Sequence, residues 1–239
     1  MECQKKILSE LETILKEASH VQEQTLLKIL VENADCEYLM KYGLREGMPW
    51  SKHLFKELIP LSDYGDIEDY VERIAGGDEP PLLCTYTILC FSISSGTTAG
   101  QSKKFPVTRE YESAFQRAQQ YMQALVKRAA SESPSSNMRV VEERKIFSVS
   151  VAGRQYETKG GHMIGSALTN YYRGEGFKNN YDSMNYTSPI EVVLTEDSPQ
   201  ALYCHLLCGL LQASQVWCLE AGFAFNMDAA FAMLRTSWQ

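Results

Sequence analysis

The chain is organised around one stretch, Phe91-Ser92-Ile93-Ser94-Ser95-Gly96-Thr97-Thr98-Ala99-Gly100-Gln101-Ser102-Lys103-Lys104. An apolar run over residues 87–91 leads into this stretch and predicts a strand. Hydroxyl side chains flank glycines, which permit positive φ values, and the backbone N–H groups of such a turn can surround phosphate oxygens. The lysine pair adds positive charge. The stretch therefore predicts a phosphate-binding loop that follows a strand.

Two well-known loops do not match this stretch. A Walker A loop requires Gly-Lys-Ser/Thr, and a nucleophile elbow requires Gly-x-Ser-x-Gly, and the sequence has neither here. A Ser/Gly-rich surface loop is the alternative, but few such loops follow an apolar run and end in paired lysines. Ser94, Ser95 and Lys103 also leave open a Ser-Ser-Lys amidase.

Apolar spacing predicts alternating helices and strands on both sides of the loop. Helices are expected through the first forty residues, over 66–74, from an N-cap at Thr108 to about residue 130, from Ser198, and over 227–238. Strands are expected over 145–151, 190–194 and 215–225. Strands that alternate with helices predict an α/β fold.

The composition favours a cytoplasmic protein without a nucleic-acid or membrane partner. The net charge is -7, which argues against nucleic-acid binding. Seven scattered cysteines without a Cys-x-x-Cys pair indicate a reducing compartment. No apolar run has transmembrane length, and the N-terminus lacks a signal-peptide core. Cys204 and Cys208 share a helix face, where core packing is favoured over metal binding, so no metal site is predicted.

The pattern Ser94-Ser95-Gly96-Thr97-Thr98-Ala99-Gly100-x-x-Lys103 resembles the first ATP-binding motif of adenylate-forming enzymes. More narrowly, the chain resembles the plant acyl acid amido synthetases, which conjugate amino acids to jasmonate, auxin or benzoates. Further matches follow the family's order at residues 33–39, 70–78, 169–173, 185–189 and 202–210.

The resemblance implies a fold and a domain organisation. It implies an α/β fold: the N-terminal part of the large domain of an adenylate-forming enzyme, with mixed sheets flanked by helices. Residues 1–239 would form a partial adenylation-type domain, with a helical start at 1–80, the nucleotide loop and its helix at 87–130, and strands and helices over 140–239. The C-terminal lid domain and the second and third nucleotide motifs would be absent.

The implied activity is that of an ATP-dependent acid–amino acid ligase acting through an acyl adenylate, with ATP and Mg²⁺ as cofactors at an incomplete site. We expect the truncated chain to be inactive alone. The alternative is a non-catalytic truncated member that binds a small acid or a protein partner. Residues 153–161 look closer to the jasmonate-conjugating members and residues 91–96 are similar to benzoate-type members, so jasmonate is favoured as the acid.

The resemblance also implies three groups of site residues, and it assigns no catalytic residue within the chain. The nucleotide group comprises Ser94, Ser95, Gly96, Thr97, Thr98 and Lys103; the acyl-acid group comprises Arg117, Gly160 and Gly161; the amino-acid group comprises Asn170, Tyr171, Tyr172, Arg173 and Gly174. Arg173 can bind a carboxylate through two hydrogen bonds. The alternatives are a solvated helix face for Arg117, a tight turn for the glycine pair, and a surface arginine beside aromatic packing for Arg173.

Overall fold

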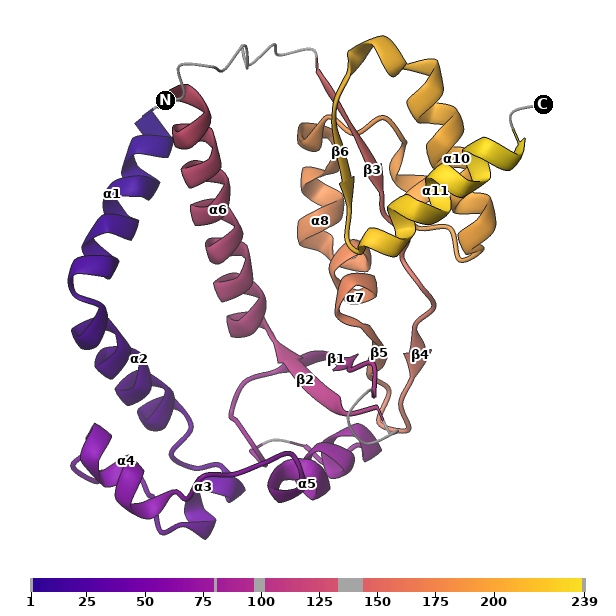
Figure 1. The fold of residues 1–239 in the computed structure, drawn as a ribbon. Helices are drawn as coiled ribbons and strands as arrows, with labels where there is room; N and C mark the ends of the chain where they lie inside the picture. The colour runs from indigo at the N-terminus through magenta and orange to yellow at the C-terminus, as the bar shows by residue number, and fades with distance from the viewer. Residues whose placement is uncertain (1, 80, 97–101, 133–143, 238–239) are drawn as a thin grey trace. The chain divides into compact units, whose positions relative to one another are not determined.

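The computed structural model describes residues 2–79, 81–96, 102–132 and 144–237. The chain divides into two compact units, which are described separately. The first unit consists of Met1–Phe91, Lys103–Asn137 and Glu157–His162, and the second of Ser92–Ser102, Met138–Tyr156 and Met163–Gln239. Helices and strands occur in both units, so the predicted α/β class is confirmed (Figure 1).

The first unit begins with helices, as the apolar spacing predicts. They are α1 (Glu2–Lys16), α2 (Ala18–Glu32), α3 (Glu37–Lys41), α4 (Lys52–Leu58) and α5 (Gly65–Gly76). A buried cluster of Leu30, Cys36, Leu39 and Leu44 joins α2, α3 and the loop after α3. Helix α5 is followed by Gly77 with φ 112°, the left-handed conformation that glycine adopts at low cost after a helix end.

The strand and helix around the central loop are also confirmed. Strand β1 (Ile88–Ile93) leads into the loop, and α6 (Arg109–Glu132) follows it. The Thr108 hydroxyl accepts the Tyr111 N–H at 3.2 Å, as an N-cap does. Strand β2 (Lys104–Thr108) pairs with β1 and was not predicted from the sequence. Its Pro106 lacks an N–H group, which an edge strand tolerates, and β2 lies at one edge of its sheet.

In the second unit, β3 (Lys145–Val149) and β6 (Val216–Ala221) form a parallel pair with Phe147 opposite Leu219 and Val149 opposite Ala221. Phe147 and Val149 pack with Leu206 of α10 (Ser198–Leu211) and Ala230 of α11 (Ala224–Ser237). A Cβ atom on Gly209 would lie 2.4 Å from the Phe147 ring, so α10 approaches β3 through glycine. Among the described residues, no helix is long and apolar enough to span a membrane.

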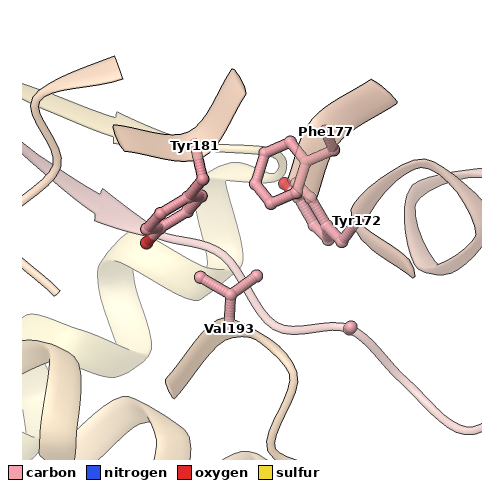
Figure 2. Packing of buried hydrophobic residues seen from close by; sticks show 5 residues of the cluster. Tyr172, Phe177, Tyr181 and Val193 are labelled. Atoms are coloured by element: carbon pink, nitrogen blue, oxygen red, sulfur yellow. The ribbon is translucent and has the colours of Figure 1, made fainter. Parts of the chain in front are cut away.

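Aromatic side chains fill a second core in this unit. Tyr172, Phe177, Tyr181 and Val193 are buried together with Ala152 (Figure 2). They come from α7 (Ala167–Arg173), α8 (Glu175–Asn180), the 3-10 helix η1 (Tyr181–Met184) and α9 (Ile190–Val193). Strand β4 (Tyr156–Glu157) precedes β5 (Met163–Ser166), which leads into α7. The 3-10 helix η2 (Ala213–Gln215) precedes β6.

The strand predicted over residues 190–194 is wrong. These residues form α9, which begins after Pro189. Two adjacent valines favour a strand by local propensity, but a helical turn places the Val193 side chain, 1% exposed, in the aromatic core. Tertiary packing therefore overrides the local preference. The strand predicted over 215–225 is confirmed over the shorter range of β6.

Candidate functional site

The central loop begins directly after β1. Ser94, Ser95 and Gly96 have no regular secondary structure, and Gly96 has φ 70°, the left-handed conformation that favours glycine. Ser94 and Ser95 have contacts with other groups. Thr97 and Thr98 lie outside the described residues. Hydroxyls and a backbone that turns through positive φ fit a polyphosphate chemically.

The two lysines after the loop have different surroundings in the first unit. Lys104 Nζ lies 2.7 and 2.6 Å from the two carboxylate oxygens of Glu72 on α5. Lys103 Nζ lies 5.2 Å from the centre of the Tyr64 ring, a cation–π contact. Lys103 also contacts another group. The predicted role of Lys103 as the cation for an anionic ligand stays a prediction.

Asn170 lies on α7 in the second unit, and both ends of its amide are hydrogen-bonded. Its Nδ2 donates to Ser92 Oγ at 3.1 Å, and its Oδ1 accepts from Gln155 Nε2 at 2.9 Å. Helix α7 is capped by Ser166, whose hydroxyl accepts the Thr169 N–H at 3.1 Å. These contacts connect the start of α7 to the last residues of β1, immediately before the loop. The predicted contact of Asn170 with an amino acid stays a prediction.

Tyr171 and Tyr172 contribute to the aromatic core. The Tyr172 ring centre lies 5.0 Å from that of Phe177, and the Tyr171 ring centre lies 5.1 Å from it. Burial raises the pKa of both phenols above the ordinary value, so both stay protonated at neutral pH. Gly174 follows α7 with φ -70° and caps α8. Aromatic packing is the alternative that the sequence left open for this segment, and the predicted place of Tyr171, Tyr172 and Gly174 beside an amino acid stays a prediction.

The Arg173 side chain reaches two backbone carbonyls. Its Nε donates to Gly153 O at 3.2 Å, and its Nη2 donates to Leu194 O at 3.4 Å and lies 3.6 Å from Glu196 Oε1. Only 24% of the side chain is exposed. Arg173 thereby holds the segments after β3 and after α9 together. Its predicted contact with an amino-acid carboxylate stays a prediction.

The Gly160–Gly161 turn lies against the end of α5 in the first unit. Gly160 N donates to Ala75 O at 2.9 Å, and a Cβ atom on Gly160 would lie 2.6 Å from Gly77 N. Gly161 has φ 83°. Thr158 N donates to His162 O at 2.8 Å, which closes the turn. A close backbone approach thus requires a glycine at 160, and the positive φ favours one at 161. Their predicted place near the acyl acid stays a prediction.

Arg117 lies on α6 and is paired with α1. Its guanidinium donates to both carboxylate oxygens of Glu10, to Gln120 Oε1 at 3.0 Å and to the Tyr121 hydroxyl at 3.2 Å. These bonds lower the pKa of Glu10 below its ordinary value. The contacts favour a structural role in holding two helices together, and the predicted contact with an acid stays a prediction.

Sequence reasoning missed a buried polar chain in the second unit. His205 of α10 is fully buried, with Nδ1 2.8 Å from Ser188 Oγ and Nε2 2.8 Å from Ser150 O. A carbonyl oxygen only accepts, so Nε2 carries the proton. Burial lowers the pKa of His205, which keeps the ring neutral. Ser188 is buried as well, so this Ser–His pair serves the fold.

The described residues include no group of three or more His, Cys, Asp or Glu side chains able to hold a metal ion. The loop thus offers donors that fit the phosphates of a nucleotide, and the predicted ATP and Mg²⁺ stay predictions. Thiol chemistry is also disfavoured near the loop, because burial raises the pKa of Cys90 on β1 to about 11.

Comparisons with known proteins support the family resemblance of the sequence. The model of the GH3 family N-terminal domain matches residues 7–239. The chain is 36% identical to the jasmonoyl–L-amino acid synthetase JAR6 of Nicotiana attenuata, over 99% of the chain and 39% of that protein. It is 35% identical to the indole-3-acetic acid-amido synthetase GH3.10 of Arabidopsis thaliana, over 95% of the chain and 38% of that protein.

The same likeness holds in three dimensions. The structure of the GH3.15 acyl acid amido synthetase matches with a TM-score of 0.81 at 28% identity, over 97% of this chain and 38% of that one. A structure of the AtGH3.15 synthetase in complex with 2,4-DB matches with a TM-score of 0.81 as well. The chain thus spans about two fifths of the length of the proteins that it matches.

Proposed function

The chain belongs to the GH3 family, and from this premise we propose that residues 1–239 provide the nucleotide loop and the amino-acid segment of an acyl acid amido synthetase. The proposed reaction joins a carboxylic acid of the plant-hormone type to an amino acid through an acyl adenylate, with ATP as the energy source and in the cytosol. The relatives' names, jasmonoyl–L-amino acid synthetase and indole-3-acetic acid-amido synthetase, support this class of reaction.

One observation carries the proposal: the loop that resembles an ATP-binding motif follows β1 directly and turns through positive φ at Gly96. In the proposed first step, a carboxylate oxygen of the acid attacks the α-phosphorus of ATP, the anhydride bond to the β-phosphate breaks, and pyrophosphate leaves. In this proposal Ser94, Ser95 and the backbone of Gly96 hold phosphate oxygens through hydrogen bonds, and Lys103 offsets their negative charge. Fixed donors of this kind stabilise charge that develops as a phosphate leaves.

The remaining proposed roles concern the two organic substrates. Asn170, with Tyr171, Tyr172, Arg173 and Gly174, would lie beside the amino acid. Arg117 and the Gly160–Gly161 turn would lie beside the acid, for which the resemblance favours jasmonate over indole acetate. Mg²⁺ would accompany ATP and bind its phosphates together with one or two carboxylates and water.

Calorimetric titration of the purified 1–239 protein with ATP tests the loop. We expect binding that weakens by at least tenfold in a Ser95→Ala, Lys103→Ala double variant, because a hydroxyl donor and a charge are both lost. Lys127→Ala on α6 is the matched charge control and should leave the affinity unchanged. Equal affinity of the double variant and the wild type would contradict the proposal. The same titrations with jasmonate, indole acetate and benzoate rank the acids.

A further inference from the structure

A cavity of about 430 Å³ lies within the second unit. Its walls come from the start of β3, from η1 and the segment that follows it into α9, and from the residue after α10. It is lined by none of the residues that the preceding proposals assign to nucleotide, acid or amino acid. Small-molecule sites have volumes of roughly 300–1,000 Å³, so the cavity is large enough for a small ligand.

Hydrogen bonds fix the backbone around this cavity. Ile146 N donates to Asn185 O at 2.9 Å, and Thr187 N donates to Ile146 O at 3.0 Å, so residues 185–187 follow the start of β3. Gln212, at the end of α10, donates from Nε2 to Thr187 O at 2.7 Å. The wall is therefore held in place by the fold itself.

One wall residue has a buried hydroxyl that the fold does not use. Thr187 is 5% exposed, and its Oγ1 has no hydrogen-bond partner among the described residues. The neighbouring groups are paired: the Ser188 hydroxyl lies 2.8 Å from His205 Nδ1, and the Tyr181 hydroxyl donates to Ser188 O at 2.9 Å. Buried polar groups are nearly always hydrogen-bonded, and an unpaired one is costly. A ligand that accepts a hydrogen bond from Thr187 would remove that cost.

Charges of both signs line the same cavity. Lys145 comes from the start of β3, next to the residue that is bonded to Thr187, while Asp182 and Glu191 come from η1 and α9. Burial raises the pKa of the Tyr181 phenol, and the charges of Glu191 and Asp182 raise it further, which places both carboxylates near Tyr181. The cavity thus offers an ammonium beside the hydroxyl and two carboxylates from other elements, a combination that suits a ligand with both charges.

We propose that this cavity binds a free α-amino acid. The ligand carboxylate lies at Lys145 and the Thr187 hydroxyl, and the ligand ammonium lies at the two carboxylates. Pro189 and Ile190 line the same cavity and contact a small aliphatic side chain. This second site goes beyond the proposed function and is separate from the segment assigned to the substrate amino acid.

Nuclear magnetic resonance of the ¹⁵N-labelled 1–239 protein tests the location and the ligand class together, with L-valine as the probe. The backbone amide signals of Asn185, Thr187 and Gln212 should shift in a saturable manner as L-valine is added. Isobutylamine and isovalerate each lack one of the two charges of valine and should bind more weakly by about tenfold or more. Shifts that do not saturate with L-valine, or equal affinity for either analogue, would overturn the inference.

Substitutions test the charged contacts. Lys145→Met and an Asp182→Asn, Glu191→Gln double variant should each weaken valine binding by about tenfold, because each removes the charge that holds one end of the ligand. Lys178→Met and Glu175→Gln are the matched controls on α8, where these two side chains lie 3.4 Å apart, and both should leave the affinity unchanged. Wild-type affinity in either test variant would overturn the inference.

Thr187→Val keeps the shape of the side chain and removes its hydroxyl. It should weaken valine binding by about three- to tenfold, as the loss of one hydrogen bond allows. The thermal unfolding temperature should not fall, because the hydroxyl has no partner in the described part of the fold. A lower unfolding temperature with unchanged affinity would assign the hydroxyl to the fold and overturn the inference.

Asn170→Ala separates this site from the proposed substrate segment. It should leave the valine-dependent shifts at Thr187 and Gln212 intact. Shifts that are lost in Asn170→Ala and kept in Lys145→Met would overturn the inference and support the segment at 170–174 as the place where the amino acid binds.

Discussion

A single arginine side chain ties together two loops of the second unit. Arg173 donates to the carbonyls of Gly153 and Leu194, so its removal leaves two partly buried acceptors with one fewer donor. Hydrogen bonds from a charged group are among the stronger ones, and an acceptor without its donor is costly. The local stability of this region should therefore depend on the guanidinium, independently of any substrate.

We expect Arg173→Ala to lower the free energy of unfolding by about 1–3 kcal/mol in urea titrations followed by circular dichroism. Arg154→Ala is the matched control, because Arg154 pairs with the same Glu196 while 68% of its side chain is exposed, and it should change stability by less than about 0.5 kcal/mol. Equal effects of the two variants would show that the carbonyl contacts do not stabilise the fold.

Arg173 also has a predicted effect on the amino acid. In an active synthetase that contains this segment, a carboxylate contact predicts that Arg173→Ala raises the KM for the amino acid and leaves acid-dependent ATP–pyrophosphate exchange mostly intact. Exchange that falls to the same degree would assign the defect to the fold instead.

His205 makes the second unit sensitive to acid. Its pKa is lowered by burial, so the unfolded chain binds a proton near pH 6.5 while the folded chain does not. Stability therefore rises with pH across the interval below 6.5 and is lost as pH falls through it. Denaturation between pH 7.5 and 5.5 should show this loss, and His205→Gln, which keeps a donor for Ser150 O, should flatten it. An unchanged slope would refute the assignment.

The phosphate-binding character of the loop could be predicted from the sequence, whereas the hydrogen-bond partners of residues 170–173 could not. Ser94, Gly96 and Lys103 are close together in the chain, so their spacing alone is enough for the prediction. Asn170 and Arg173 bond to Ser92, Gln155, Gly153 and Leu194, which are 15–78 positions away. Only tertiary structure brings such groups together, so the sequence could not show that these polar side chains hydrogen-bond to other parts of the chain.

At the scale of elements, the approach of the 158–162 turn to α5 depends on two glycines. A Cβ atom on Gly160 would lie 2.6 Å from Gly77 N and 2.7 Å from Gly77 Cα, distances that only a backbone shift can relieve. Gly160→Ala should lower the free energy of unfolding by about 1–3 kcal/mol, as overpacking does. Thermal unfolding measures the change.

Gly76→Ala provides the control for that substitution. Gly76 is the last residue of α5, and a Cβ atom there would meet nothing within 4 Å. We expect no loss of stability and a gain of up to about 1 kcal/mol from helix propensity. A loss as large as that of Gly160→Ala would mean that the end of α5, rather than the close approach, is sensitive to added bulk.

Elements with a strong period were predicted well, and short ones were not. Helix α6 was predicted with its N-cap because its apolar residues recur over several turns and Thr108 marks its start. Strand β2 was missed because proline argues against a central strand, and its edge position was not visible in the sequence. The sequence predicts a strand in place of helix α9, because four residues contain too few turns to show a helical period.

At the scale of the molecule, the second unit exposes apolar side chains around its parallel strand pair. Trp217 and Leu219 of β6 are 46% and 55% exposed, and Phe223 and Phe225, whose rings stack 5.7 Å apart, are 55% and 68% exposed. Parallel sheets are normally covered on both faces. Exposed strands with large apolar residues promote association, so the 1–239 protein should have a measurable tendency to aggregate.

The last prediction concerns turnover by residues 1–239. These residues span 39% of a relative whose name states a complete synthetase activity. Donors for phosphate are present in the loop, but a reaction requires acid, ATP and amine to be held together, and a misplacement of about 1 Å can cost on the order of a hundredfold in rate. We therefore expect the 1–239 protein to bind polyphosphate without acid-dependent release of pyrophosphate.

The measurement is a coupled pyrophosphate assay with ATP, Mg²⁺, and jasmonate, indole acetate, salicylate or benzoate, with the Ser95→Ala, Lys103→Ala variant as background. Acid-dependent release above that background would show that residues 1–239 suffice for adenylation and would contradict the prediction.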